Sequence, residues 1–300
     1  MPRVLVSGLI NLETTLRVDG FPVDYFPVRY PFYGVSSSVS GVGYNVARAL
    51  SCLGDELAFL SLIGQDPAGE IVQNSLRRDG LPAENVLPRL HETPQSVILY
   101  DGQGRRQIHV DLKDIQEQHY PPEAFERALA GCQAAALCNI NFSRPFLARA
   151  RQAGKLIATD VHALSSLDDE YNREFIQAAD ILFMSHENLP TSPEDFAHEV
   201  VRRFATPILV IGLGSQGALL YVERKGLLER FPAVATRPIV NTIGAGDALF
   251  SAFLHAYLQA GDPRAALRRA MLFASWKIGE NGAANGFLDA DGLEELERKK

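Results

Sequence analysis

Short runs of apolar residues recur along this chain, and segments with apolar residues at helical spacing lie between several of them. A run that is apolar at nearly every position predicts a strand buried on both faces, because successive side chains point to opposite sides of a sheet. Strands that alternate with helices predict a parallel sheet with helices on both faces. The runs are VLVSGLI, LAFLSLIG, AAALCNI, KLIATDV, ILFMS and ILVIGLG. The pattern therefore predicts an α/β protein, a three-layer α/β/α sandwich around a mostly parallel central sheet.

Two stretches interrupt this alternation and predict a small β-sheet lid. Residues 14–36 are rich in Val, Phe, Tyr and Pro, and residues 94–111 contain SVILYDGQGRRQIHV, which is typical of a hairpin turning at Asp101-Gly102. With 300 residues and 46% apolar composition, the chain can build one large core. We therefore expect a single domain over residues 1–300, with the lid inserted from these two stretches.

Charge and composition exclude several classes of partner. The net charge is −7 and the longest Lys/Arg run is the terminal Arg298-Lys299-Lys300, so nucleic acid is not an expected partner. No apolar run approaches the ~18 residues of a membrane span, and the first residues lack a signal-sequence pattern, which predicts a cytoplasmic protein without membrane contact. Cys52, Cys132 and Cys138 are odd in number and show no CxxC spacing, which favours buried thiols over disulfides or a zinc site.

Polar side chains follow several of the predicted strands. The carboxyl ends of parallel strands meet at one edge of the sheet, where ligands bind, and amide and carboxylate groups there suit the hydroxyls of a sugar. The alternative for any one of them is an ordinary turn residue. The residues are Asn11, Glu13, Asn139, Asn141, Asp160, His162, Ser185, Glu187, Asn188 and Ser215.

The segment VNTIGAGDALFSAFLHAYLQAG places Gly244, Ala245 and Gly246 directly before a strongly helical run. Small residues at a helix start let backbone N–H groups converge on an anion, and the helix dipole adds partial positive charge. Asp247 follows in the first turn. A carboxylate there opposes phosphate binding unless it has a task, and the natural task is to accept the proton of a hydroxyl that attacks phosphorus. The alternative is that Asp247 only caps the helix.

Two other glycine clusters are less specific. SGVGYNVARAL puts Gly41 and Gly43 before a helix, where a ligand can approach the backbone and Asn45 follows into the pocket; an ordinary glycine turn is the alternative. Residues 212–217, GLGSQG, formally match the dinucleotide-binding fingerprint. That fingerprint needs a helix after the glycines, whereas ALLYVE is typical of a strand. We expect a loop that contacts a nucleotide and leads into a hairpin.

Two long motifs occur in order along the chain. The first is GVGYNVARALSCLG followed by DELAFLSLIG, and the second is NTIGAGDALFSA. Similarity extends over nearly the whole chain through GLINLE, GQDPAGE, DILFMSHEN, IGLGSQGA and ASWKIGENGA. By these motifs the chain resembles the ribokinase-like (PfkB) carbohydrate kinases. The resemblance implies a nine-stranded or similar α/β sandwich with a β lid, often a homodimer through that lid, and the use of ATP with Mg²⁺.

The resemblance also implies roles for individual residues. Asp247 takes the place of the catalytic base, and the N–H groups of Gly244, Ala245 and Gly246 take that of the anion hole. The expected acceptor-binding residues are Asn11, Glu13, Gly41, Gly43, Asn45 and Asn141. The expected nucleotide-binding residues are Ser185, Gly214, Ser215, Gly217, Thr242, Asn281, Gly282 and Ala283.

Some positions depart from the family's pattern. Asn241 stands where the second motif usually begins with Asp, which in some members helps to hold an activating monovalent cation, so the resemblance does not extend to potassium activation. Residues 185–188, SHEN, retain neither end of the Asn-x-x-Glu motif linked to Mg²⁺ and phosphate, and Glu187 is the neighbouring candidate metal ligand. Val42 and Asn141 stand where ribokinase has Lys and, roughly, Glu, so ribose is not the expected acceptor.

The sequence therefore predicts an ATP-dependent phosphotransferase acting on a hydroxyl of a small sugar or sugar derivative. A nucleoside kinase of the same fold is one alternative, because aromatic lid residues can stack a base; a lid that packs on a dimer mate explains the same residues. A non-catalytic sugar sensor is another, because of the changes at residues 185–188 and 241. The lid aromatics are Phe21, Tyr25, Phe26, Tyr30, Phe32 and Tyr33.

Overall fold

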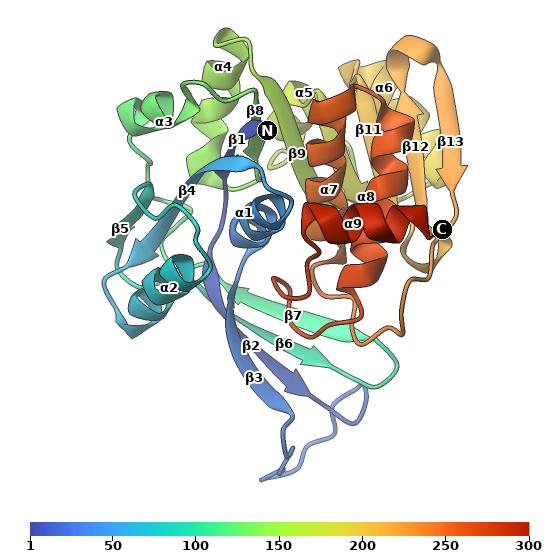
Figure 1. The fold of residues 1–300 in the computed structure, drawn as a ribbon. Helices are drawn as coiled ribbons and strands as arrows, with labels where there is room; N and C mark the ends of the chain where they lie inside the picture. The colour runs from blue at the N-terminus through green and yellow to red at the C-terminus, as the bar shows by residue number, and fades with distance from the viewer. Residues whose placement is uncertain (300) are drawn as a thin grey trace.

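A large sheet forms the middle layer of the protein (Figure 1). The computed structural model describes residues 1–299. The strands of this sheet are β1 Arg3–Ser7, β4 Glu56–Gly64, β5 Val86–Leu90, β8 Ala134–Leu137, β9 Leu156–Ala163, β10 Ile181–Ser185, β11 Ile208–Gly212, β12 Ala218–Val222 and β13 Leu227–Phe231. Their spatial order is β13-β12-β11-β10-β9-β8-β1-β4-β5, and only the β11–β12 and β12–β13 pairs are antiparallel. The mostly parallel sheet predicted from the apolar runs is confirmed.

Helices cover both faces of this sheet, which gives the predicted three layers (Figure 1). One face packs against α1 Val42–Cys52, α2 Pro67–Arg78, α7 Ala245–Ala260, α8 Pro263–Lys277 and α9 Ala290–Arg298. The other face packs against α3 Pro122–Leu129, α4 Arg144–Gln152, α5 Arg173–Ala178 and α6 Pro193–Phe204.

The strand β1 shows why a continuous apolar run is needed here. Val4 and Val6 lie in the core beneath α1 and α7, whereas Leu5 lies in the core beneath α3 and α4. In β10, Phe183 and Met184 divide between the two cores in the same way. Helices on each face bury the side chains that point to that face. A polar residue at any of these positions would therefore lose its hydration.

The segment after the GLGSQG sequence forms a hairpin and not a helix. Residues 218–222 are β12, a short 3-10 turn follows at Glu223–Lys225, and β13 returns antiparallel. At Gly217, φ is +102°, and a Cβ atom would lie 2.0 Å from the carbonyl oxygen of Phe231. The glycine is therefore required by the close approach of β13, and the dinucleotide fingerprint is excluded, as the sequence indicated.

A second, four-stranded sheet lies apart from the helical layers, below them in Figure 1. Its strands are β2 Asn11–Arg17, β3 Val35–Ser40, β6 Gln95–Tyr100 and β7 Arg106–Asp111, in the order β3-β2-β6-β7. The predicted hairpin is confirmed, since β6 and β7 pair antiparallel. The first two strands, with the segment between them, span residues 11–40, more than the stretch 14–36 marked by composition, because their outer ends are polar residues such as Asn11 and Ser40.

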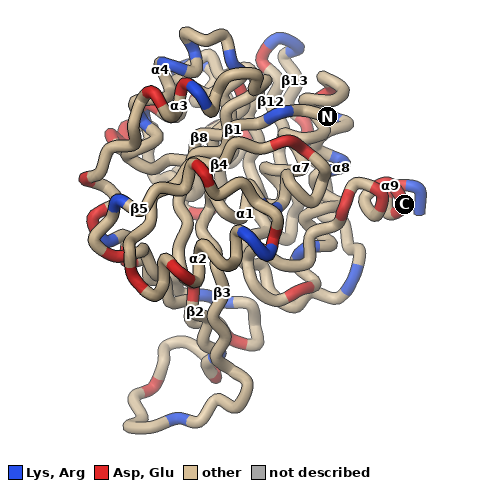
Figure 2. Tube along the Cα trace, turned by 60° about the vertical axis from the view of Figure 1, so that its left-hand side comes forward, with Lys and Arg blue, Asp and Glu red and all other residues tan. Residues whose placement is uncertain are grey.

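The strands of this sheet are joined in a register that gives it an inner face. Glu13 pairs with Ser96, and Ile98 pairs with Ile108, so these side chains share one side of the sheet. Ile98 is buried against Ile243 and Ala283 of the larger domain, which identifies that side as the inner face. Between β2 and β3, residues 18–34 form a long excursion at the lower tip of the molecule (Figures 1 and 2).

Charges of both signs are scattered along the chain, and neither sign gathers on one side in the view of Figure 2. Among the helices of residues 1–299, none combines the length and apolar character needed to cross a membrane.

Candidate active site

Asp247 lies in the first turn of α7, where it meets a residue from the other end of the sequence. The side-chain amide of Asn45, in α1, donates a hydrogen bond of 2.7 Å to its Oδ2. Burial raises the pKa of the Asp247 carboxyl, while the bond from Asn45 and the positive charge of Lys277 act in the opposite direction. A carboxylate that is fixed in place and made more basic is suited to accept a proton.

The residues before Asp247 leave room for an anion. Gly244 has φ of +75°, and a Cβ atom there would lie 2.4 Å from the carbonyl oxygen of Ala283, so this glycine is required by the fold. Gly246 is exposed, and a Cβ atom there would meet only a carboxylate oxygen of Asp160, at 3.9 Å. No protein atom explains the missing side chain at Gly246, so its open side is free for a ligand.

The amides of the predicted anion hole differ in their partners. The N–H of Ala245 donates to the carbonyl oxygen of Thr242 at 3.2 Å, so in this conformation it is engaged within the turn. Among residues 1–299, the backbone N–H groups of Gly244 and Gly246 have no hydrogen-bond acceptor. Those two amides, at the positive end of the α7 dipole, are the available donors.

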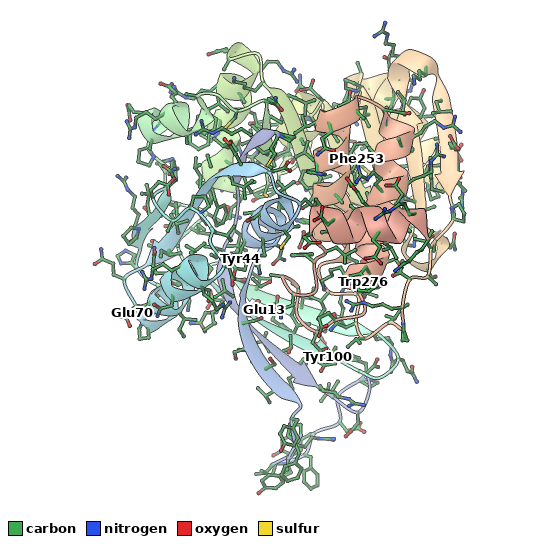
Figure 3. The ribbon with its side chains drawn as sticks, in the orientation of Figure 1. Glu13, Tyr44, Glu70, Tyr100, Phe253 and Trp276 are labelled. Carbon is green, nitrogen blue, oxygen red and sulfur yellow. The ribbon has the colours of Figure 1, made fainter. Side chains whose placement is uncertain are left out.

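Two of the predicted acceptor-binding residues have buried oxygen atoms that lack hydrogen-bond partners among the described residues, Oδ1 of Asn11 and Oε1 of Glu13. The amide of Asn11 donates to Ser96 at 2.9 Å, which turns its oxygen away from that bond. Burial raises the pKa of Glu13, and the negative charge of Asp247 acts in the same direction. Figure 3 shows Glu13 where the small sheet joins the helical body. Unpaired buried acceptors are costly, and hydroxyl donors of a ligand would satisfy them.

Backbone conformation and packing within the chain explain why glycine stands at positions 41 and 43. Gly41 has φ of +103°, and a Cβ atom at Gly43 would lie 2.5 Å from the backbone of Gly8. These contacts let α1 approach the end of β1 and so place Asn45 against Asp247. At Gly43 the space that the sequence reserved for a ligand is therefore filled by the chain itself. Asn141 bonds elsewhere, since its side-chain amide donates to the carbonyl of Gln116 at 3.0 Å.

The predicted nucleotide-binding residues lie in several loops and at strand ends. Gly214 and Ser215 are exposed in the turn after β11, Asn281 is exposed, and Ala283 packs against Gly244. Ser185 accepts the N–H of Glu187 at 3.1 Å, and the Glu187 side chain is exposed.

Two basic residues of the site were missed by the sequence analysis. Arg106, on β7, donates to the carbonyl and the hydroxyl of Thr242 at 3.1 and 3.0 Å, which ties the small sheet to the second motif. Lys277, at the end of α8, is completely buried, and the negative charges of Asp247 and Glu13 act on it to raise its pKa. Nothing in its local sequence marks Arg106, whereas a lysine within the apolar stretch MLFASWKIG was a signal for Lys277.

Metal ligands are sparse in this region. Residues 1–299 contain no group of three or more His, Cys, Asp and Glu residues arranged to hold a metal ion. The nearest carboxylate to the open side of Gly246 is Asp160, which accepts the backbone N–H of His162 at 2.8 Å through its other oxygen.

A family model for pfkB family carbohydrate kinases matches residues 1–290. The chain belongs to this family. The enzyme class expected from the sequence, an ATP-dependent carbohydrate kinase, is confirmed, and the use of ATP follows from it.

Curated relatives of this PfkB-family kinase cover nearly its whole length. It is 28% identical over 264 residues to acarbose 7(IV)-phosphotransferase of Actinoplanes sp., covering 87% of this chain and 86% of that protein. It is also 28% identical over 291 residues to an ATP-dependent ribose-1-phosphate kinase of Halopiger xanaduensis, covering 94% of each. A solved microbiome-derived acarbose kinase aligns with TM-score 0.88 and 26% identity over 98% of both chains. A nucleoside kinase of Methanocaldococcus jannaschii aligns with TM-score 0.77 and 20% identity over 100% and 99%, and shares the fold.

Proposed function

We propose that this kinase transfers the γ-phosphoryl group of ATP to a hydroxyl of a small sugar or sugar derivative, with Asp247 as general base. The observation that carries the proposal is the Asn45–Asp247 bond of 2.7 Å beside the open side of Gly246. It puts a fixed, partly buried carboxylate next to free amides at a helix N-terminus. A hydroxyl bonded to Asp247 would lie beside a phosphoryl group bound by those amides, which is the geometry that direct transfer requires.

The acceptor would bind between Asp247 and the inner face of the small sheet, which acts as a lid. Asn11 and Glu13 would accept hydrogen bonds from its hydroxyl groups. Asp247 would take the proton of the attacking oxygen as that oxygen bonds to the γ-phosphorus and the bond from this phosphorus to ADP breaks. The amides of Gly244 and Gly246 would stabilise negative charge on the phosphoryl oxygens. The Arg106 contact with Thr242 would hold the lid closed and exclude water, which otherwise competes as the acceptor.

Mg²⁺ fits this site as a partner of the ATP phosphates. It binds oxygen ligands and commonly keeps several waters, so it needs few protein carboxylates. Asp160, beside the open side of Gly246, and the exposed Glu187 are the residues that would contact it or its waters. When bound, the ion neutralises phosphate charge. The nucleotide itself would lie over the loops at Gly214, Ser215 and residues 281–283.

The test is ADP release from ATP and Mg²⁺ across a panel of acceptors, with Asp247→Asn measured beside the wild type. The panel contains D-fructose, D-ribose 1-phosphate, inosine and acarbose, compounds or compound classes for which relatives are named. We expect one acceptor to support turnover and Asp247→Asn to lower kcat at least about 10²-fold. A fully active variant would refute the role of Asp247. Acceptors that raise Tm without ADP release would indicate a sugar sensor instead.

A carbohydrate acceptor is favoured over a nucleoside by where the lid aromatics lie. Tyr25 is 91% and Phe32 86% exposed, and both belong to the excursion of residues 18–34 at the tip of the lid (Figure 1). They are therefore not placed to stack a base bound beside Asp247 of the same chain. Turnover with inosine and not with the sugars would reverse this preference.

We also propose that a second copy of this chain covers the exposed lid, as a homodimer. The exposed apolar residues gather in the excursion between β2 and β3, which is where a partner lid would remove them from water. Light scattering on the purified protein tests this. A dimer that becomes monomeric in Phe32→Glu would support it, and a wild-type monomer at micromolar concentration would refute it.

A further inference from the structure

Lys277 is the most deeply buried charged group near the active site, with no exposed surface. Its ammonium donates to the carbonyl oxygen of Ile243 and, at 2.8 Å, to that of Gly282. Ile243 directly precedes Gly244, and Gly282 lies in the loop that packs against Gly244. One side chain therefore joins the two segments that shape the anion hole.

Asn241 joins the same two segments from the other side. Its side-chain oxygen accepts the N–H of Ile243 at 3.1 Å, and its side-chain nitrogen donates to Asn281 at 3.0 Å. An aspartate at this position would lack the donor for the second bond. A neutral amide at 241 and an ammonium at 277 thus complement each other, and both act on the backbone around Gly244.

The ammonium has carboxylates near it as well as carbonyl oxygens. Asp247 of α7, Glu13 of β2 and Glu280 of the following loop face it, and Arg106 of β7 is the nearby like charge. Burial lowers the pKa of Lys277, to about 8, and the three carboxylates act in the opposite direction. The side chain is therefore mostly protonated at pH 7, and a positive charge is present between the two loops.

We propose that Lys277 is a fixed internal cation that positions the anion hole of this kinase. Its ammonium draws the carbonyls of Ile243 and Gly282 together, which sets the direction of the free amides of Gly244 and Gly246. No monovalent ion is then needed between these loops. This inference rests on the kinase activity proposed above, and Lys277 is a positioning residue because it acts through the backbone and not on the substrate.

The test compares four proteins in chloride salts of tetramethylammonium, sodium, potassium and ammonium at equal ionic strength. They are the wild type, Lys277→Ser, Lys277→Met and Met271→Ala. Serine leaves a space bordered by carbonyl oxygens that a small cation can enter, whereas methionine fills that space without charge. Met271, which is 9% exposed on α8, controls for loss of helix packing. The readouts are Tm and, with whichever of D-fructose, D-ribose 1-phosphate, inosine and acarbose supports turnover, kcat.

We expect the wild type to respond to no salt by more than about twofold in kcat. Lys277→Ser in tetramethylammonium should lose at least about 10²-fold in kcat, because the amides are no longer aligned. Ammonium or potassium should restore at least about tenfold of that loss and raise the Tm of this variant by at least about 2 °C, since a bound ion stabilises the fold. Lys277→Met should lose activity without rescue, and Met271→Ala should lose Tm without any ion response.

Three results would overturn the proposal. The first is a wild-type kcat that rises severalfold with potassium, which would mean that a free ion is still required. The second is Lys277→Met within about threefold of the wild-type kcat. The third is Lys277→Ser with no ion response in Tm or kcat, the outcome of a purely structural anchor. If no acceptor supports turnover in the wild type, the proposed function fails, and the Tm response of Lys277→Ser still decides this inference. If Lys277→Ser does not fold, the wild-type salt series and Lys277→Met decide it.

Discussion

Replacing Gly246 with alanine should separate catalysis from stability. A Cβ atom at this position meets only a carboxylate oxygen of Asp160, at 3.9 Å, which is ordinary van der Waals contact. The residue lies in the first turn of α7 and its φ is not in the left-handed region. Alanine is favoured over glycine in a helix by up to about 1 kcal/mol, so Gly246→Ala should not destabilise the protein.

The expected change in Tm is small. The entropy of unfolding of a chain of this length, about 2.1 cal/mol/K per residue, converts 1 kcal/mol into a rise of at most about 2 °C. Catalysis should respond in the opposite way. The added methyl group would occupy the space through which, in the proposed mechanism, a phosphoryl oxygen reaches the Gly246 amide, and loss of one such donor costs about 10²–10³-fold in kcat.

Gly244→Ala is the matched comparison. At this neighbouring position φ is +75° and a Cβ atom would lie 2.4 Å from the Ala283 carbonyl oxygen. Left-handed geometry alone costs about 1–2 kcal/mol, so the same substitution here should lower Tm by at least about 2 °C. The assays are thermal unfolding and steady-state kinetics with varied ATP. Gly246→Ala with kcat/KM within about threefold of the wild type would refute the anion hole described here, whatever its Tm.

Three further predictions follow from single contacts. Arg106→Ala removes both hydrogen bonds to Thr242 and should raise KM for ATP about 5–10-fold, as expected for a loss of about 1 kcal/mol. Arg105→Ala is the control and should leave KM unchanged, because the Arg105 guanidinium bonds Asp101 in the hairpin turn. Equal effects of the two substitutions would contradict a role for the Arg106–Thr242 contact. Burial raises the pKa of Glu13, so the folded state binds its proton more tightly than the unfolded state, and stability falls as the pH rises from the unfolded to the folded pKa of this group. Glu13→Gln should therefore raise Tm at pH 7, while the lost acceptor should raise KM for the sugar at least about tenfold. An unchanged KM would contradict a role of Glu13 in acceptor binding. If Asp247 is the proposed base, it must be a carboxylate, and because its pKa is raised, kcat/KM should fall on acidification at a pH above the ordinary aspartate value of about 3.9. A profile flat down to pH 4 would exclude it as the base.

The sequence by itself determined the fold class, and it marked one short segment as the candidate site. Short runs such as ILVIGLG, apolar at nearly every position, are typical of strands buried on both faces, and this prediction is confirmed. The GAGD sequence before a helical run predicted an anion-binding site at Asp247 and the glycines before it, because a helix N-terminus binds anions by local geometry. Such features depend on residues that are neighbours in the chain.

Only the tertiary structure decided which distant residues meet. Asn45 and Asp247 are 202 positions apart, and no local pattern pairs them. The hydrogen bonds from Arg106 to Thr242 join residues 136 positions apart and depend on how the small sheet packs against the helical body. Gly43, which the sequence assigned to ligand approach, is required by the backbone of Gly8. Lys277 joins Ile243 to Gly282 only because α8 ends beneath both loops. Pairing over such distances is set by the packing of whole elements, which residue spacing along the chain does not encode.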